Sequence, residues 1–109
     1  LYKLRIERRR KMKVKANTNV NKLAGAIAGF VREEGKAELQ AIGAAAVNQA
    51  VKAVITARGY LIPSGIDIAI TPSFQVTETE GRETTIIHMC ITSNHKQETK
   101  KENGEDGNH

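Results

Sequence analysis

The sequence predicts a two-layer α/β domain, an α+β sandwich in which two helices cover one face of a four-stranded mixed sheet. Along the chain, the spacing of apolar residues alternates between the period of a strand and the period of a helix, and it ends with two strands. This gives the order βαβαββ. Only 4% of the residues are aromatic, so the core is expected to consist of Ala, Val, Ile and Leu. The chain has 109 residues, which is room for one domain with one hydrophobic core.

The first half of the predicted domain contains a strand, a helix and a short second strand. Residues 12–16 alternate between apolar and polar, which is the period of a strand with one covered face. Residues 17–19 offer helix caps, and residues 20–31 carry apolar side chains at helical spacing until Gly35 ends the helix. Residues 38–42 read as the second strand. Because a helix connects these strands, they are expected to pair in parallel through a right-handed crossover.

The second half is expected to contain a helix followed by a hairpin. Helical spacing resumes after Gly43 and is expected to end at Gly59. After a turn, a third strand is predicted from residue 67 to about residue 74, and a fourth over residues 84–93. Residues 80–82 stand where the hairpin should turn.

The ends of the chain differ in composition from the domain, which we place at residues 12–93. Residues 1–11 hold six Lys or Arg and one Glu, and they are predicted to form a flexible basic leader, with an added strand as the alternative. Residues 94–109 are polar and are predicted to be disordered. The domain carries eight basic and seven acidic residues, so net charge alone does not identify its partner.

Several classes of protein are disfavoured by the sequence. The longest uncharged run, residues 39–51, is too short and too polar to span a bilayer, and we found no signal-peptide pattern. A single cysteine, Cys90, cannot form an intramolecular disulfide. We therefore expect a cytoplasmic protein without a membrane role.

No catalytic or metal-binding pattern is convincing. His88, Cys90 and His95 lack the paired spacing of a zinc site, and His88 and Cys90 are expected to share a structural environment on one strand face. Cys90 has no glycine elbow or helix N-terminus to activate it, so a buried structural thiol is expected. Gly25 and Gly29 are interpreted as sites of close helix packing. We expect no enzyme activity, no cofactor, no metal and no small-molecule substrate.

Polar and basic side chains near the two helices offer a second interpretation. On the second helix these residues are Asn48, Gln49, Lys52 and Thr56, and near the start of the first they are Lys13, Lys15 and Lys22. Lysine and amide donors commonly hold phosphates, so the two sets together are candidates for a phosphate-binding surface. An ordinary solvated face is the alternative.

Long runs of the sequence match one protein family. Residues 22–29 read KLAGAIAG, residues 37–53 read AELQAIGAAAVNQAVKA, and the match continues through residues 57–60 and 63–67. Over residues 12–91 the chain closely resembles the stage V sporulation protein S family, and its AIGAxAxNQAVKA run is specific to that family. The resemblance implies an Alba-like fold, a part in bacterial sporulation and a homodimer that binds nucleic acid.

The resemblance also indicates where nucleic acid would be held. Alba-type proteins use the first strand-to-helix loop and the last hairpin. The candidate nucleic-acid-binding residues by position are Lys13, Lys15, Asn17, Lys22 and Arg82. Two features differ from a strong Alba-type binder: the loop has no Gly-Lys-Lys cluster, and the hairpin mixes Arg82 with three glutamates, which repel phosphate.

Two hypotheses follow. The leading one is a non-enzymatic, dimeric regulator of sporulation that contacts the sugar-phosphate backbone of DNA or RNA without reading bases. The alternative is a protein-interaction module that regulates sporulation without binding nucleic acid.

Overall fold

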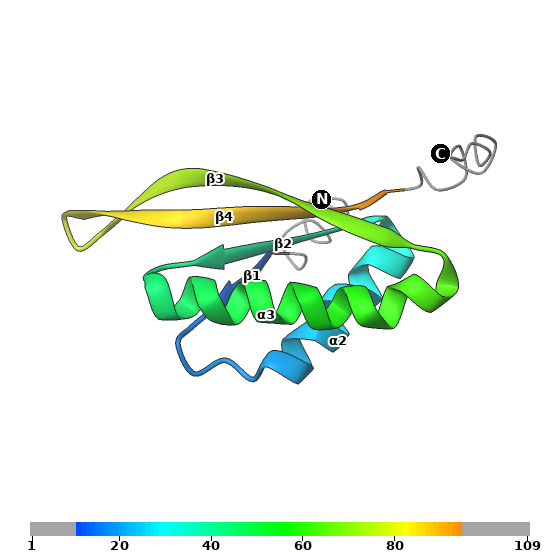
Figure 1. Cartoon of the computed structure of the whole chain (residues 1–109). Helices are drawn as coiled ribbons and strands as arrows, with labels where there is room; N and C mark the ends of the chain where they lie inside the picture. Colours follow the sequence, from blue (N-terminus) through cyan, green and yellow to red (C-terminus); the bar gives the residue numbers. More distant parts are fainter. Residues whose placement is uncertain (1–10, 95–109) are drawn as a thin grey trace, which may run out of the picture.

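The computed structural model describes residues 11–94, which form two layers, a sheet with both helices packed on one side of it (Figure 1). The elements are β1 (Lys11–Val14), α2 (Val20–Glu34), β2 (Lys36–Ala41), α3 (Ala44–Leu61), the 3-10 turn η1 (Ile62–Ser64), β3 (Asp67–Thr79) and β4 (Arg82–Asn94). The predicted order βαβαββ is confirmed. Of the predicted leader (residues 1–11) and tail (residues 94–109), residues 1–10 and 95–109 lie outside the described residues, whereas Lys11 begins β1 and Asn94 ends β4.

The sheet is mixed, as predicted, with the strand order β1-β2-β4-β3. β1 and β2 are parallel, whereas β4 is antiparallel to both β2 and β3. The register places Leu39 opposite Met89 on the helical side. It places Glu38 opposite Cys90 and Gln40 opposite His88 on the other side, which we call the open face. Both helices therefore cover one face, and polar side chains line the other.

β3 and β4 extend beyond the rest of the sheet as a long hairpin (Figure 1). β2 ends at Ala41, opposite Ile87, whereas β3 and β4 remain paired as far as Thr79 and Arg82. The two connecting residues, Glu80 and Gly81, have φ values of 53° and 78°, as a tight two-residue hairpin turn requires. The hairpin was predicted, but β3 continues to Thr79 instead of ending near Phe74. Pro72 lies within this strand, as predicted. Proline is tolerated there because β3 is an edge strand.

Small and aliphatic side chains fill the space between the layers. The residues with relative exposure of 1% or less in this core are Ala24, Ile27, Ala28, Ala37, Leu39, Ala41, Ala50, Ala53, Ala57, Leu61 and Ile91. Alanines make up four of the six buried residues of α3 and two of the five of α2, which lets the helices approach each other and the sheet closely. The predicted aliphatic core is confirmed.

Local contacts set the ends of the helices. The Asn19 side chain accepts a hydrogen bond from the Lys22 backbone N–H at 2.9 Å, which caps α2. Gly35 ends α2 in the left-handed region (φ 78°), and its N–H donates to the Val31 carbonyl. The predicted end of the second helix at Gly59 was wrong, because α3 continues to Leu61, which is fully buried. Burying a leucine contributes about 1.5–3 kcal/mol, more than the roughly 1 kcal/mol that a glycine costs inside a helix.

Two further expectations need correction. An added Cβ at Gly25 or Gly29 would meet nothing within 4 Å, so these glycines do not mediate close helix packing; buried alanines do. Cys90 is half-buried on the open face rather than fully buried, because no helix covers that side. No helix within residues 11–94 is long and apolar enough to cross a membrane.

Candidate nucleic-acid interface

The loop between β1 and α2 is held in one conformation by a set of hydrogen bonds. The Lys15 N–H donates to Thr18 Oγ1 at 2.7 Å, and the Thr18 N–H donates to the Lys15 carbonyl at 3.1 Å. The Gln49 side chain on α3 donates to the Thr18 carbonyl at 2.9 Å. Together with the Asn19 cap, these contacts fix the backbone that carries Lys15, whose side chain is exposed.

A groove lies where β1 and β2 end while β3 and β4 run on. It has a volume of about 800 Å³. The residues that line this sheet-end groove are Lys13, Val14, Lys15, Ala16, Gln40, Ile42, Gln75, Val76, Thr77 and Ile86. One wall therefore comes from the end of β1 and the loop that follows it, and the other comes from the hairpin. Both lysines are exposed, so their ammonium groups can meet an anion that approaches from solvent.

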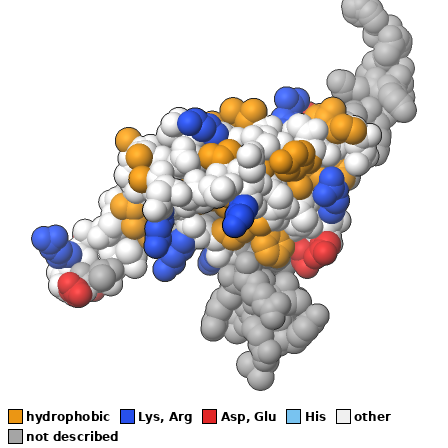
Figure 2. Space-filling model, turned by 90° about the horizontal axis from the view of Figure 1, so that it is seen from below, with side chains coloured by type: hydrophobic (Ala, Val, Ile, Leu, Met, Phe, Trp, Pro, Cys, Tyr) orange, Lys and Arg blue, Asp and Glu red, His pale blue; other side chains and the backbone are white. Residues whose placement is uncertain are grey.

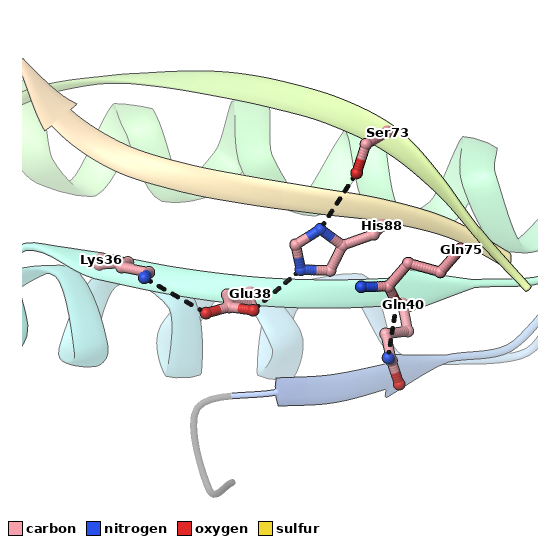
Figure 3. Close-up of polar contacts among 6 residues, drawn as sticks. All are labelled: Lys36, Glu38, Gln40, Ser73, Gln75 and His88. Atoms are coloured by element: carbon pink, nitrogen blue, oxygen red, sulfur yellow. Dashed lines mark hydrogen bonds and ion pairs between the residues drawn. The ribbon is translucent and has the colours of Figure 1, made fainter. Parts of the chain in front are cut away.

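Two glutamine side chains meet in this groove (Figure 3). Gln40 lies on β2 and Gln75 on β3, with β4 between the two strands. Gln40 Nε2 donates to Gln75 Oε1 at 3.1 Å across β4. We call these two side chains the amide pair. Lys13 is the register partner of Gln40 on β1, so a cation and the amide pair share the open face.

Next to the amide pair, the open face carries a short chain of polar contacts (Figure 3). Lys36 Nζ lies 3.4 Å from Glu38 Oε2, and His88 Nε2 lies 2.8 Å from Glu38 Oε1. The His88 ring also lies 3.4 Å from the Ser73 hydroxyl. Partial burial by itself raises the pKa of Glu38, but the hydrogen bond with His88 and the charge of Lys36 outweigh it and lower that pKa below its usual value.

The lowered pKa of Glu38 predicts a pH-dependent contribution to stability. A carboxyl whose pKa is lower in the folded state stabilises the fold above its unfolded pKa, near 4.5, and this contribution is lost as the pH falls through the folded pKa. Glu38→Gln should therefore lower the free energy of unfolding by about 1 kcal/mol at neutral pH, and by much less in strong acid. Urea denaturation at neutral pH and at about pH 3 measures the difference.

Glu33→Gln is the matched control, because Glu33 is an exposed carboxylate at the end of α2. This control should keep the pH dependence of the unaltered chain. An equal loss of stability at both pH values for Glu38→Gln would show that the charge on Glu38 does not contribute.

An apolar patch lies on the helical side of the sheet, where the β3–β4 hairpin extends past the N-terminal end of α3 (Figure 1). It comprises Val47 and Val51 of α3 with Phe74 and Ile87 of the hairpin. Phe74 is 75% exposed, although it stands in register with Ile87, and Val51 is 38% exposed. A shallow depression between α3 and β4 is lined by Val47, Val51 and Ile87 among others. This much exposed apolar surface in one place is typical of an interaction site.

The hairpin tip is acidic. Glu78 stands opposite Glu83 in the register, and Glu80 lies in the turn, so Arg82 is the one cation beside three carboxylates. Figure 2 shows acidic side chains together with a basic one at this tip, and Lys and Arg side chains spread over the body. The tip itself is therefore a poor surface for phosphate.

Comparison with known proteins identifies the family and the fold of the chain. Residues 10–94 match the family model described as stage V sporulation protein S (SpoVS). The chain belongs to the SpoVS family. Among solved structures, Alba from Thermoplasma volcanium is similar, with a TM-score of 0.53 and 16% identity over 77% of this chain and 98% of that chain. At that identity the likeness shows the fold alone, and the predicted Alba-like fold is confirmed.

The SpoVS domain brings together only some of the predicted binding residues. Lys13 and Lys15 line the sheet-end groove. Asn17 is exposed on the adjoining loop, and Lys22 is exposed in the first turn of α2. Arg82 stands apart from the groove lining, beside the glutamates of the hairpin tip. Of the predicted binding residues, Lys13 and Lys15 thus share the groove lining, whereas Asn17, Lys22 and Arg82 lie outside it.

Two of the four polar side chains noted on the second helix form hydrogen bonds within the SpoVS domain, and the other two are exposed. Gln49 holds the loop, and the Thr56 hydroxyl donates to the Lys52 carbonyl one turn earlier at 3.0 Å. Asn48 and Lys52 are exposed. Sequence reasoning missed the role of Gln49 in fixing the loop. Within residues 11–94 of the SpoVS domain, no group of three or more His, Cys, Asp or Glu side chains is placed to hold a metal ion.

Proposed function

We propose that this domain is a non-enzymatic regulator of sporulation that binds nucleic acid in the cytoplasm, with Lys13 and Lys15 contacting the sugar-phosphate backbone. The observation that carries the proposal is the pair of exposed lysines at a groove, one of them on a loop fixed by Thr18 and Gln49. Lysines on a fixed backbone can meet phosphates without ordering a mobile loop first. Membership of the SpoVS family supports the sporulation role.

The two lysines should account for a measurable part of the salt dependence. On duplex DNA each lost phosphate contact lowers the slope of log affinity against log salt by about 0.9, so Lys13→Ala/Lys15→Ala should lower it by about 1.8. At about 0.1 M salt this corresponds to roughly a 60-fold loss of affinity. Fluorescence anisotropy of labelled DNA and RNA, titrated with the full chain at several salt concentrations, measures both quantities.

Lys52→Ala is the matched control, because Lys52 is an exposed lysine on α3 that does not line the groove. It should change the slope by less than one contact. Unchanged affinity and slope in the double variant would remove the two lysines from the interface. If the full chain bound neither DNA nor RNA even at low salt, the nucleic-acid function would be wrong. The protein-interaction reading, which the acidic hairpin tip and the apolar patch favour, would then replace it.

We also propose that the protein is a homodimer joined through the apolar patch. The patch is nearly free of charge, so two copies can meet across it without burying unpaired ions. If the two α3 helices run antiparallel across a two-fold axis, each hairpin tip points along the partner's α3 and extends beyond the apolar contact.

A further inference from the structure

The sheet-end groove contains more than a pair of cations. Within the amide pair, Gln40 Nε2 donates to Gln75 Oε1, and no other hydrogen bond joins these two amides to residues 11–94. The Gln40 carbonyl oxygen therefore remains as an acceptor, and the Gln75 amide nitrogen remains as a donor. Flipping both amides exchanges these roles and still leaves one donor and one acceptor. The groove thus offers a neighbouring donor and acceptor to a ligand.

Aliphatic surface lies next to these amide groups. Ile42 is 55% exposed and lines the groove together with the buried Ile86. Exposed apolar side chains around a few hydrogen-bonding groups are typical of a site for a flat, partly polar molecule. No aromatic side chain lines the groove, so ring stacking does not contribute there.

The three kinds of group match the three parts of a nucleotide. The lysines suit its phosphate, the amide pair suits the polar edge of its base, and the aliphatic wall suits the flat face of the base. The aliphatic wall can reach the flat face of a base only when the base is unstacked, because neighbouring base pairs cover both faces in a duplex. A duplex would have to flip a base out first, which costs a few kcal/mol.

We propose that the sheet-end groove binds an unpaired base of a single-stranded nucleic acid, so that the protein prefers single strands to duplexes. This inference rests on the proposed function and goes beyond it, because backbone contacts alone do not distinguish the state of the bases. The lysines are exposed at the groove while the amide pair is half-buried, so the phosphates run along the outside and the base points inward.

The test compares three labelled oligonucleotides of one length with the full chain at low salt: a single strand, its duplex, and the same single strand with abasic residues. The single strand should bind about tenfold more tightly than the duplex. Gln40→Ala/Gln75→Ala should lose about tenfold for the single strand, because two hydrogen bonds are removed, and should change little for the duplex. The abasic strand should bind the unaltered protein as weakly as the intact strand binds this variant.

Two further variants guard against misfolding and against a general surface effect. Ile42→Asp adds a negative charge to the groove at a position that is already 55% exposed, and it should also remove the preference for single strands. Thr71→Ala changes an exposed polar residue of β3 outside the groove lining, and it should leave the preference unchanged. Thermal unfolding followed by circular dichroism confirms that each variant is folded.

The outcomes separate the inference from the function on which it rests. Equal binding of single strand, duplex and abasic strand, with no effect of the glutamine or Ile42 variants, would overturn the groove assignment while the backbone-binding function stands. No binding of any oligonucleotide would overturn both. A free mononucleotide that competes as well as the strand, at equal nucleotide concentration, would show that the groove is a site for a small nucleotide and would overturn the strand assignment.

Discussion

Leu39→Ala is expected to lower the free energy of unfolding by about 2–5 kcal/mol. Leu39 has no exposed surface and lies in the middle of β2, with Met12 of β1 and Met89 of β4 as its register partners on either side. Truncation there leaves a cavity between the sheet and the helices that small alanine side chains cannot fill. Because small domains are stable by only about 5–15 kcal/mol, this one change removes a large share of the total.

Urea denaturation followed by circular dichroism measures the loss. Ile55→Ala is the matched control, since Ile55 is 65% exposed on the outer side of α3 and should lose less than about 0.5 kcal/mol. A loss below about 1 kcal/mol for Leu39→Ala would mean that the layers do not pack around β2 as described.

Phe74→Asp is expected to convert the proposed dimer into monomers. Burying a phenylalanine contributes about 1.5–3 kcal/mol, and a two-fold contact loses this contribution twice, so the dimer Kd should rise by at least about 100-fold. The protomer should stay folded, because Phe74 is 75% exposed within one chain. Sedimentation velocity over a range of protein concentrations measures the change in mass and its concentration dependence.

Ile62→Asp provides the control for this prediction. Ile62 is an exposed apolar residue of similar kind, but it lies in η1 after the C-terminal end of α3, away from the apolar patch. The control should sediment as the unaltered chain does. A monomer before any substitution would contradict the dimer, and a dimer that tolerates Phe74→Asp would place the contact on another surface.

The order of the elements and the covered face of the sheet were predictable because they depend on local periodicity. A period of two and a period of 3.6 can be read from apolar positions without knowing what each element contacts. The predicted helix end at Gly59 failed because Leu61, two residues later, is buried only by tertiary packing. The third strand extends beyond its predicted end near Phe74, because its pairing with β4 continues as far as the hairpin turn.

The candidate site was predictable only in the part that is continuous in sequence. Lys13 and Lys15 lie at the end of one strand and in the following loop, so their shared location follows from the chain itself. The amide pair joins residues 35 positions apart across an intervening strand. No motif in the sequence assigns a binding role to either glutamine, and only the register of the finished sheet brings them together.

The hydrogen bond from Gln49 to the Thr18 carbonyl links two surfaces that otherwise look separate. Gln49 is a residue of α3, and the same helix contributes Val47 and Val51 to the apolar patch. The side chain that anchors the lysine-bearing loop is thus fixed to the element on which a second copy would dock. Any rigid-body shift of α3 on association is transmitted directly to the Thr18 carbonyl and to the backbone of Lys15. If the protein dimerises and binds nucleic acid as proposed, such a shift would couple assembly to ligand affinity, and each would change the other by the same factor.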